Sequence, residues 1–158
     1  MIEVRAPEDY ASIAGKKAIF LAGSIEMGKA ENWQERIVAS LRHMDVLLLN
    51  PRRVHWDAAM AQSADNPDFR EQVEWELDAL DRADMVVMYF APETRSPITL
   101  LELGIHAAAN PEKLIVCCPD GFWRKGNVDI VCQRFGVQQV PGLTELVKSA
   151  VSFLQKAA

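Results

Sequence analysis

Glu102 is the residue of this sequence whose type and setting best suit chemistry. It stands in Leu100-Leu101-Glu102-Leu103-Gly104, and a carboxylate buried among apolar residues is rarely idle, because its charge needs a partner. Helical spacing marks one side of this segment with Ile98, Leu101 and Ile105, and Glu102 lies beside that side. Spacing alone therefore leaves two evenly balanced interpretations, a working carboxylate and a solvated helix residue.

A second source of carboxylates is the segment 71–84, which holds six acids: Glu71, Glu74, Glu76, Asp78, Asp81 and Asp84. For each of them a solvated helix face is favoured by roughly three to one. One buried acid of this segment, paired with Glu102, would suit the cleavage of a glycosidic bond. In that chemistry one carboxyl group attacks or stabilises the cationic sugar, and the other handles the proton.

Small polar residues that follow apolar runs are candidates for binding a substrate. Gly23, Ser24 and Ile25 follow the first such run, and their N–H groups and the Ser24 hydroxyl could hold a phosphate or sugar oxygen. Because the GxGxxG pattern is absent, an ordinary turn is favoured here by roughly two to one. Asn50 follows the next apolar run, and Ser96 precedes a helix-opening proline, where it is a candidate N-cap.

Two loop tryptophans, Trp56 and Trp123, are candidates for stacking on a base, and each is equally well explained as a packed loop anchor. Trp56 belongs to the segment 52–66, which has no clear periodicity and is expected to be a long loop. A loop of that length in a compact domain is more often functional than idle. Trp33 and Trp75 instead fit core-facing helix positions.

Length, composition and charge limit the classes of protein. The chain has 158 residues, 49% of them hydrophobic, and a net charge of −5. We therefore expect one folded domain over residues 1–158 with an N-terminal arm or short strand at 1–15, and no partnership with a nucleic acid polymer or an anionic membrane. No run approaches the roughly 18 apolar residues of a membrane span. The first residues also lack the apolar core of a signal peptide, so a cytoplasmic location is expected.

The cysteines and histidines do not form a metal-binding pattern. The cysteines are odd in number, and two of them are adjacent in an apolar run: Cys117, Cys118 and Cys132. They are expected to be buried thiols in a reducing compartment. The three histidines are scattered without HExxH-type spacing, so neither a metal nor a cofactor is predicted.

Short apolar runs alternate with helical periods along the chain. Strands are predicted at 18–22, 46–49, 85–90, 114–118 and 137–140, and helices at 31–41, 68–83, 97–109, 128–135 and 142–155. This alternation predicts an α/β fold, a flavodoxin-like three-layer sandwich with a five-stranded parallel sheet in the order 2-1-3-4-5. Ligands of such sheets bind beyond the carboxyl ends of the strands, at the switch point between strands 1 and 3. Several of the candidate residues follow those strand ends.

Four segments between about residues 18 and 109 resemble the nucleoside 2-deoxyribosyltransferase superfamily: FLAGSIEMG, LLLNPRR, LDALDRADMVVMYF and SPITLLELGIHAA. The resemblance implies a flavodoxin-like fold and makes Glu102 the nucleophile of a covalent glycosyl–enzyme intermediate. A second base resolves this intermediate in transferases, and water does so in hydrolases. The resemblance also implies that Asp78 binds the sugar or handles protons, with Glu76 as the alternative if the alignment shifts. Asp84 matches a structural position.

Two departures from the family pattern concern the substrate. Transferases of the family carry an aspartate six residues before the nucleophile, where this chain has Ser96. The related 2'-deoxynucleoside 5'-monophosphate N-glycosidases carry a serine there for the 5'-phosphate, and share the Gly-Ser-Ile segment, in which Ser24 would be a phosphate ligand. They also carry an arginine where this chain has Glu26, whose carboxylate would repel phosphate. Three arginines are candidates for compensating that charge: Arg52, Arg53 and Arg95.

The resemblance predicts an enzyme that cleaves or transfers at the N-glycosidic bond of a (deoxy)nucleoside or nucleoside 5'-monophosphate, with Glu102 and Asp78 as catalytic residues. The expected substrate-binding residues are Gly23, Ser24, Ile25, Asn50, Ser96 and Trp56. Two alternatives are a non-catalytic nucleotide-binding module on the same fold and a diverged protein whose pocket is blocked by the 52–66 loop. Because family members assemble as dimers or larger oligomers, a homodimer or higher homo-oligomer is expected.

Overall fold

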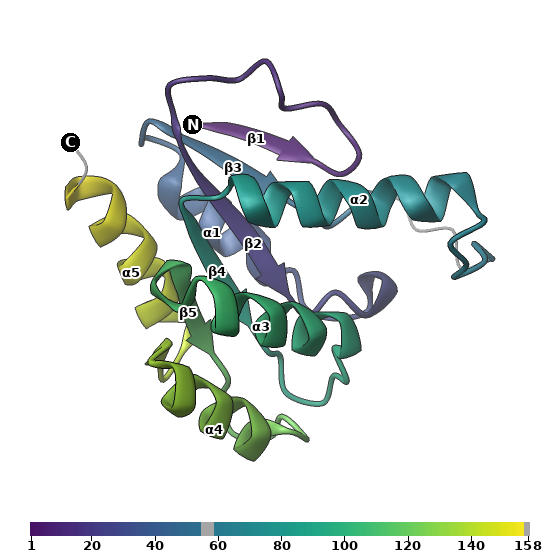
Figure 1. Cartoon of the computed structure of the whole chain (residues 1–158). Coiled ribbons are helices and arrows are strands. Elements are labelled where there is room, and N and C mark those ends of the chain that lie inside the picture. The colour runs from purple at the N-terminus through teal and green to yellow at the C-terminus, as the bar shows by residue number, and fades with distance from the viewer. Residues whose placement is uncertain (55–58, 157–158) are drawn as a thin grey trace.

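The chain forms one parallel sheet with helices on both faces (Figure 1). The computed structural model describes residues 1–54 and 59–156. The strands are β1 (Ile2–Arg5), β2 (Lys17–Gly23), β3 (Val46–Asn50), β4 (Met85–Tyr89), β5 (Leu114–Cys117) and β6 (Gln138–Val140). They lie in the order β1-β3-β2-β4-β5-β6, and every neighbouring pair is parallel. The predicted α/β class with a parallel sheet is confirmed.

The predicted number of strands is wrong, because the N-terminal segment adds a sixth. Ile2–Arg5 pairs with β3 in a register that sets Ile2 beside Leu47. The five predicted strands keep the expected relative order inside the larger sheet. The added strand has only four residues and lies at the edge of the sheet, so it needs a single partner and little apolar character. Residues 1–15 were expected to form an arm or a short strand, and the predicted five-stranded sheet did not include them.

The helices divide between the two faces of the sheet. They are α1 (Trp33–Leu41), α2 (Pro67–Arg82), α3 (Pro97–Ala109), α4 (Lys125–Phe135) and α5 (Leu143–Lys156), with short 3-10 turns η1 (Glu26–Gly28) and η2 (Pro111–Lys113). Helices α2, α3 and α4 share one hydrophobic core with the sheet, and α1 and α5 share the other. Successive residues of β2 alternate between the cores, as Ile19 and Phe20 do. No described helix has both the length and the apolar character to cross a bilayer.

The starts of α2 and α3 are built differently. Asn66 caps α2, since its side-chain oxygen accepts from the N–H groups of Asp68 and Phe69 at 3.0 and 3.3 Å. Ser96 precedes α3 with φ +44°, and its side chain makes no capping hydrogen bond. Ser96 thus stands at the predicted N-cap position, but its hydroxyl bonds to another loop instead of capping the helix.

The three cysteines are buried and free, as expected. Burial raises the pKa of Cys117 and Cys132 to about 11 and that of Cys118 to about 12. Such thiols stay protonated near neutral pH and are poor nucleophiles. They serve packing and take no part in the site described next.

Candidate active site

The candidate site begins where β2 and β4 end side by side, with Gly23 in register with Tyr89. A Cβ on Gly23 would lie 2.4 Å from the Tyr89 carbonyl oxygen, and φ at this residue is +146°. Only glycine fits such a close approach. The next residue, Ser24, donates its N–H to the same carbonyl at 2.9 Å. The loops that follow the two strands are thereby drawn together, at the switch point where ligands of such sheets bind.

Three hydroxyl groups join these two loops. The Ser24 hydroxyl lies 2.6 Å from the Ser96 hydroxyl and 2.9 Å from that of Thr94, and the latter two are 3.0 Å apart. Thr94 also donates to the Ala91 carbonyl at 2.8 Å, and the Ala91 N–H donates to the Ser24 oxygen at 2.8 Å. The predicted residues Ser24 and Ser96 are therefore brought together, both buried. Thr94 was missed, because its role depends on this long-range contact.

The carboxylate of Glu26 occupies the start of α3. Its Oε1 accepts the N–H groups of Arg95 and Ser96 at 2.8 and 2.6 Å. The described non-glycine residues with positive φ all lie in these two loops: Glu26, Met27, Glu93 and Ser96. Strained backbone of this kind persists only where the surrounding contacts enforce it, and it clusters at functional sites. From the sequence, Glu26 was seen only as a source of repulsion.

Two other predicted binding residues have structural partners in the described part of the chain. The Asn50 side chain donates to Glu3 at 2.8 Å and accepts the Arg52 N–H at 3.0 Å, so it ties β1 to the loop after β3. The Ile25 carbonyl accepts from Gly28 at 2.9 Å, which closes the turn containing η1. The predicted residue Trp56 lies outside the described residues.

Glu102 lies on the second turn of α3 and is buried, with 8% of its surface exposed. Within the described ranges no group donates a hydrogen bond to its carboxylate. Burial and then the charge of Glu76 raise its pKa from the ordinary 4.5 to about 8. Helical spacing left open whether Glu102 is a solvated helix residue or a buried carboxylate. The structure shows that it is buried, and its oxygens remain available to a ligand.

Glu76 on α2 is the acidic residue whose charge acts on Glu102. It accepts a hydrogen bond from Gln72 at 2.5 Å, and Gln72 in turn accepts one from Arg53. Burial raises the pKa of Glu76 to about 7, although the bond from Gln72 and the charge of Arg53 act against that rise. Two carboxyl groups with raised pKa values therefore share one region between α2 and α3.

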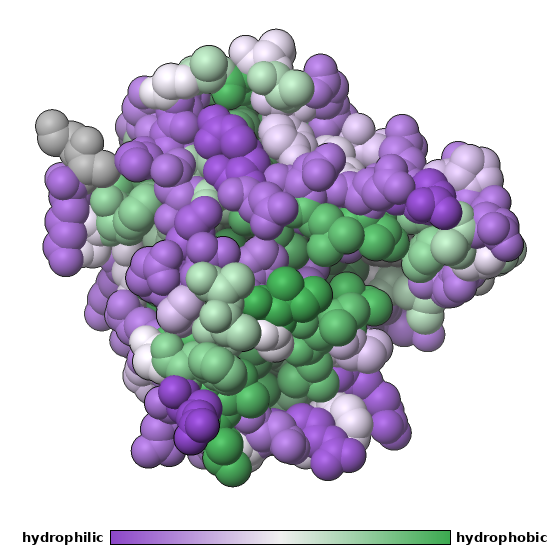
Figure 2. Space-filling view, viewed as in Figure 1, coloured by the Kyte–Doolittle hydropathy of each residue, from purple (hydrophilic) through white to green (hydrophobic). Residues whose placement is uncertain are grey.

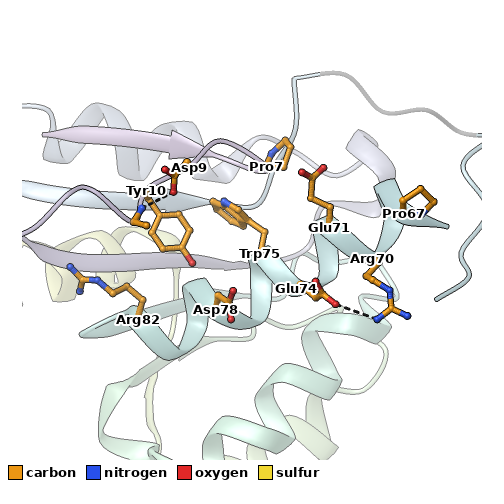
Figure 3. Close-up of a pocket in the computed structure, with 11 residues that line it drawn as sticks. Pro7, Asp9, Tyr10, Pro67, Arg70, Glu71, Glu74, Trp75, Asp78 and Arg82 are labelled. Carbon is orange, nitrogen blue, oxygen red and sulfur yellow. Dashed lines mark hydrogen bonds and ion pairs between the residues drawn. The ribbon is translucent and has the colours of Figure 1, made fainter. Parts of the chain in front are cut away.

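Asp78 lies on a different face of α2. It is exposed and lines a hollow of about 660 Å³ with Tyr10 and Trp75, between the N-terminal segment and the helix (Figure 3). Two residues of helix turn by about 200°, so Glu76 and Asp78 point to nearly opposite sides. The structure brings Glu76 toward Glu102 and places Asp78 beside Tyr10, whose pKa it helps to raise.

A second hollow, of about 430 Å³, opens at the mouth of the site. Three of its lining side chains are carboxylates, Glu26, Glu31 and Glu93, and one is the ammonium group of Lys29. Glu31 accepts the hydroxyl of Tyr89 at 2.8 Å, which ties this hollow to the end of β4. The mouth is therefore a negatively charged environment.

A parallel sheet with polar loops at its carboxyl edge and a buried glutamate on the following helix is the arrangement typical of α/β proteins that bind small molecules at the switch point. The family model described as "Nucleoside 2-deoxyribosyltransferase like" matches residues 16–122. The chain belongs to this family, as its sequence motifs predicted. Glu102, Glu76 and both loops at the switch point lie inside the matched region.

One solved structure of similar fold is the crystal structure of a conserved protein from Enterococcus faecalis V583. It superposes with a TM-score of 0.58 at 14% sequence identity, over 85% of this chain and 96% of that chain. At that identity the likeness supports the fold alone. No functionally curated protein matches the sequence.

Proposed function

We propose that this protein cleaves the N-glycosidic bond of a nucleoside or nucleoside 5'-monophosphate, by transfer or hydrolysis, through a covalent bond between the sugar and Glu102. The observation that carries the proposal is a buried carboxyl group to which no described residue donates a hydrogen bond, on the helix that follows the switch-point strand. Burying such a group is costly, so its presence calls for a role beyond packing. Membership of the deoxyribosyltransferase-like family supplies the reaction class.

In the first step a Glu102 carboxylate oxygen attacks the anomeric carbon of the sugar. A carbon–oxygen bond forms, the carbon–nitrogen bond breaks, and its electron pair passes to the nitrogen of the leaving base, which takes up a proton. In the second step water or another base attacks the same carbon and releases the Glu102 carboxylate. The incoming water or base gives up a proton in that step, so protons balance over the cycle.

Glu76, rather than Asp78, is the residue we assign to proton handling. With a pKa of about 7, Glu76 exists in both protonation states near neutral pH, as a general acid and base requires. Its charge also opposes ionisation of Glu102. Near neutral pH the two carboxyls share one proton, which lies mostly on Glu102 because its pKa is the higher. The reactive form is the minor one, in which that proton lies on Glu76 as the acid and Glu102 is ionised as the nucleophile.

The test is incubation with deoxynucleosides and their monophosphates, followed by chromatography for free base. Wild type should release base from at least one of them, and Glu102→Gln should not. Glu71→Gln, which changes an exposed carboxylate on α2, is the matched control and should retain activity. Base release by Glu102→Gln at the wild-type rate contradicts the proposal. Ligand-induced stabilisation without turnover points to the non-catalytic binding module.

A homo-oligomer is part of the same proposal. Ile98, Leu101 and Ile105 form an apolar stripe on α3 and are 57, 60 and 47% exposed. Figure 2 shows apolar side chains gathered over this helix and the adjoining parts of the surface. Contiguous exposed apolar side chains of this kind mark interaction surfaces. Light scattering should give at least twice the mass of one chain, and Leu101→Glu should reduce it, whereas a monomeric wild type contradicts this part.

A further inference from the structure

The start of α3 is an anion site that the protein fills itself. Backbone N–H groups at the start of a helix are a common binding place for phosphate groups. Here the N–H groups of Arg95 and Ser96 both donate to one oxygen of Glu26, and Figure 1 shows η1 beside that end of α3. A phosphate entering this place would have to displace a carboxylate or share its donors.

The neighbouring hydroxyls have no protons to spare for a phosphate. Thr94 uses its proton on the Ala91 carbonyl, so only the hydroxyl protons of Ser24 and Ser96 remain for three mutual contacts. Ser24 is fully buried and Ser96 is nearly so. Two protons serve three contacts, so one contact already lacks a proton, and turning either donor toward a ligand would leave a second buried contact without one.

The arginines that could compensate the charge of Glu26 are engaged elsewhere. Arg52 donates to the carbonyl oxygens of Gly28, Ala30 and Glu31 at 2.8–3.1 Å, which fixes the loop after η1. Arg53 bonds to Gln72, on the Glu76 side of the site. Each of these guanidinium groups would lose protein contacts on turning to a phosphate.

Arg95, the third candidate, packs its guanidinium 5.2 Å from the centre of the Trp123 ring. Its carbonyl also accepts the Trp123 ring N–H at 3.0 Å, so this tryptophan anchors the loop. In the hollow at the mouth, Lys29 faces three carboxylates. The local charge balance therefore opposes an anionic group.

The spacing along α3 relates this filled site to the nucleophile. Ser96 and Glu102 are six positions apart, which corresponds to about 9 Å along the helix. Side chains on a helix tilt toward its N-terminus, so the Glu102 carboxyl group leans toward the Glu26 end. A sugar held with its anomeric carbon at Glu102 can thus direct its 5' end toward Glu26.

From these contacts we propose that Glu26 fixes the substrate class of this site as a nucleoside with a free 5'-hydroxyl. Oε1 of Glu26 holds the start of α3, and Oε2 accepts the 5'-hydroxyl, whereas a 5'-phosphate is repelled. The inference rests on the proposed N-glycosidic activity for its substrate.

The test compares each deoxynucleoside with its 5'-monophosphate in wild type, Glu26→Gln, Glu26→Ala and Glu93→Gln. Wild type should favour the nucleoside in kcat/KM by roughly tenfold or more, the scale of a like-charge repulsion at a partly exposed site. Glu26→Gln keeps an oxygen for the α3 N–H groups and should lose most of the discrimination. Glu93→Gln removes one charge from the same hollow without touching the α3 N–H groups, and it should lose far less of the discrimination than Glu26→Gln does.

A binding measurement separates failure of this inference from failure of the proposed activity. Inorganic phosphate should raise the melting temperature of Glu26→Ala, whose α3 N–H groups are vacated, and leave wild type unchanged. Should Glu26→Ala not fold, the same comparison is made with Glu26→Gly, which also vacates the N–H groups and suits the positive φ of this position. If no form releases base, the activity proposal fails, and the phosphate shifts still decide the role of Glu26. Wild type that prefers monophosphates, or that binds inorganic phosphate as well as the variants do, overturns the inference.

Discussion

Replacing Glu102 by glutamine should stabilise the protein, and more so as the pH rises. The pKa of Glu102 is raised in the folded protein from 4.5 to about 8, so folding favours the protonated carboxyl group. Its contribution to stability is therefore full below about pH 4.5 and is lost as the pH rises through 8. Glutamine keeps the size of the side chain and cannot ionise, so Glu102→Gln removes this loss.

The size of the effect follows from the shift in pKa. Relative to wild type, the gain in the free energy of unfolding from Glu102→Gln should grow by about 3 kcal/mol between pH 5.5 and pH 8.5. Urea unfolding of both proteins at the two pH values measures it. Glu71→Gln, on the exposed face of α2, is the control and should show no comparable growth.

The reasoning is refuted if Glu102→Gln and wild type keep a constant difference in stability across this pH range. That result would mean that Glu102 titrates like an exposed carboxyl group. The buried, raised-pKa nucleophile of the proposed mechanism would then not exist in the folded protein.

Other changes at the site have equally definite outcomes. Glu76→Gln should lower kcat and remove the ionisation near pH 7 from the pH–rate profile, whereas Asp78→Asn should leave both unchanged; equal effects would contradict the assignment of Glu76. Gly23→Ala should cost roughly 3 kcal/mol or more in urea unfolding, because its Cβ would meet a backbone carbonyl at 2.4 Å. Ser24→Ala should lower the free energy of unfolding by about 1–3 kcal/mol, because it removes the acceptor of the buried Ala91 N–H. An unchanged free energy of unfolding would contradict that hydrogen bond.

The central sheet could be predicted from the sequence because its strands consist almost entirely of apolar residues. The runs that became β2, β3, β4 and β5 are buried along nearly all of their length, and such runs have few alternatives in a compact fold. The sixth strand was left out of the predicted sheet because an edge strand of four residues needs little apolar character, so its segment could equally be an arm. Its pairing with β3 is a long-range contact that local pattern does not reveal.

The site was predictable to the extent that it depends on helix geometry. Glu76 and Gln72 are four residues apart and share a face, and that geometry separates Glu76 from Asp78. The bond from the Ser96 N–H to Glu26 joins residues 70 positions apart. No local sequence pattern predicts such a contact. The occupation of the α3 N–H groups by Glu26 could therefore be found only in the folded structure.

The most direct test of the central claim is detection of the sugar on Glu102 itself. The protein is mixed with a 2'-deoxynucleoside, quenched in acid, digested and analysed by mass spectrometry. The account predicts a deoxyribosyl adduct on the peptide that carries Glu102, absent from Glu102→Gln and retained in Glu71→Gln. Release of base by wild type with no adduct on that peptide at any time in the turnover would contradict the covalent mechanism.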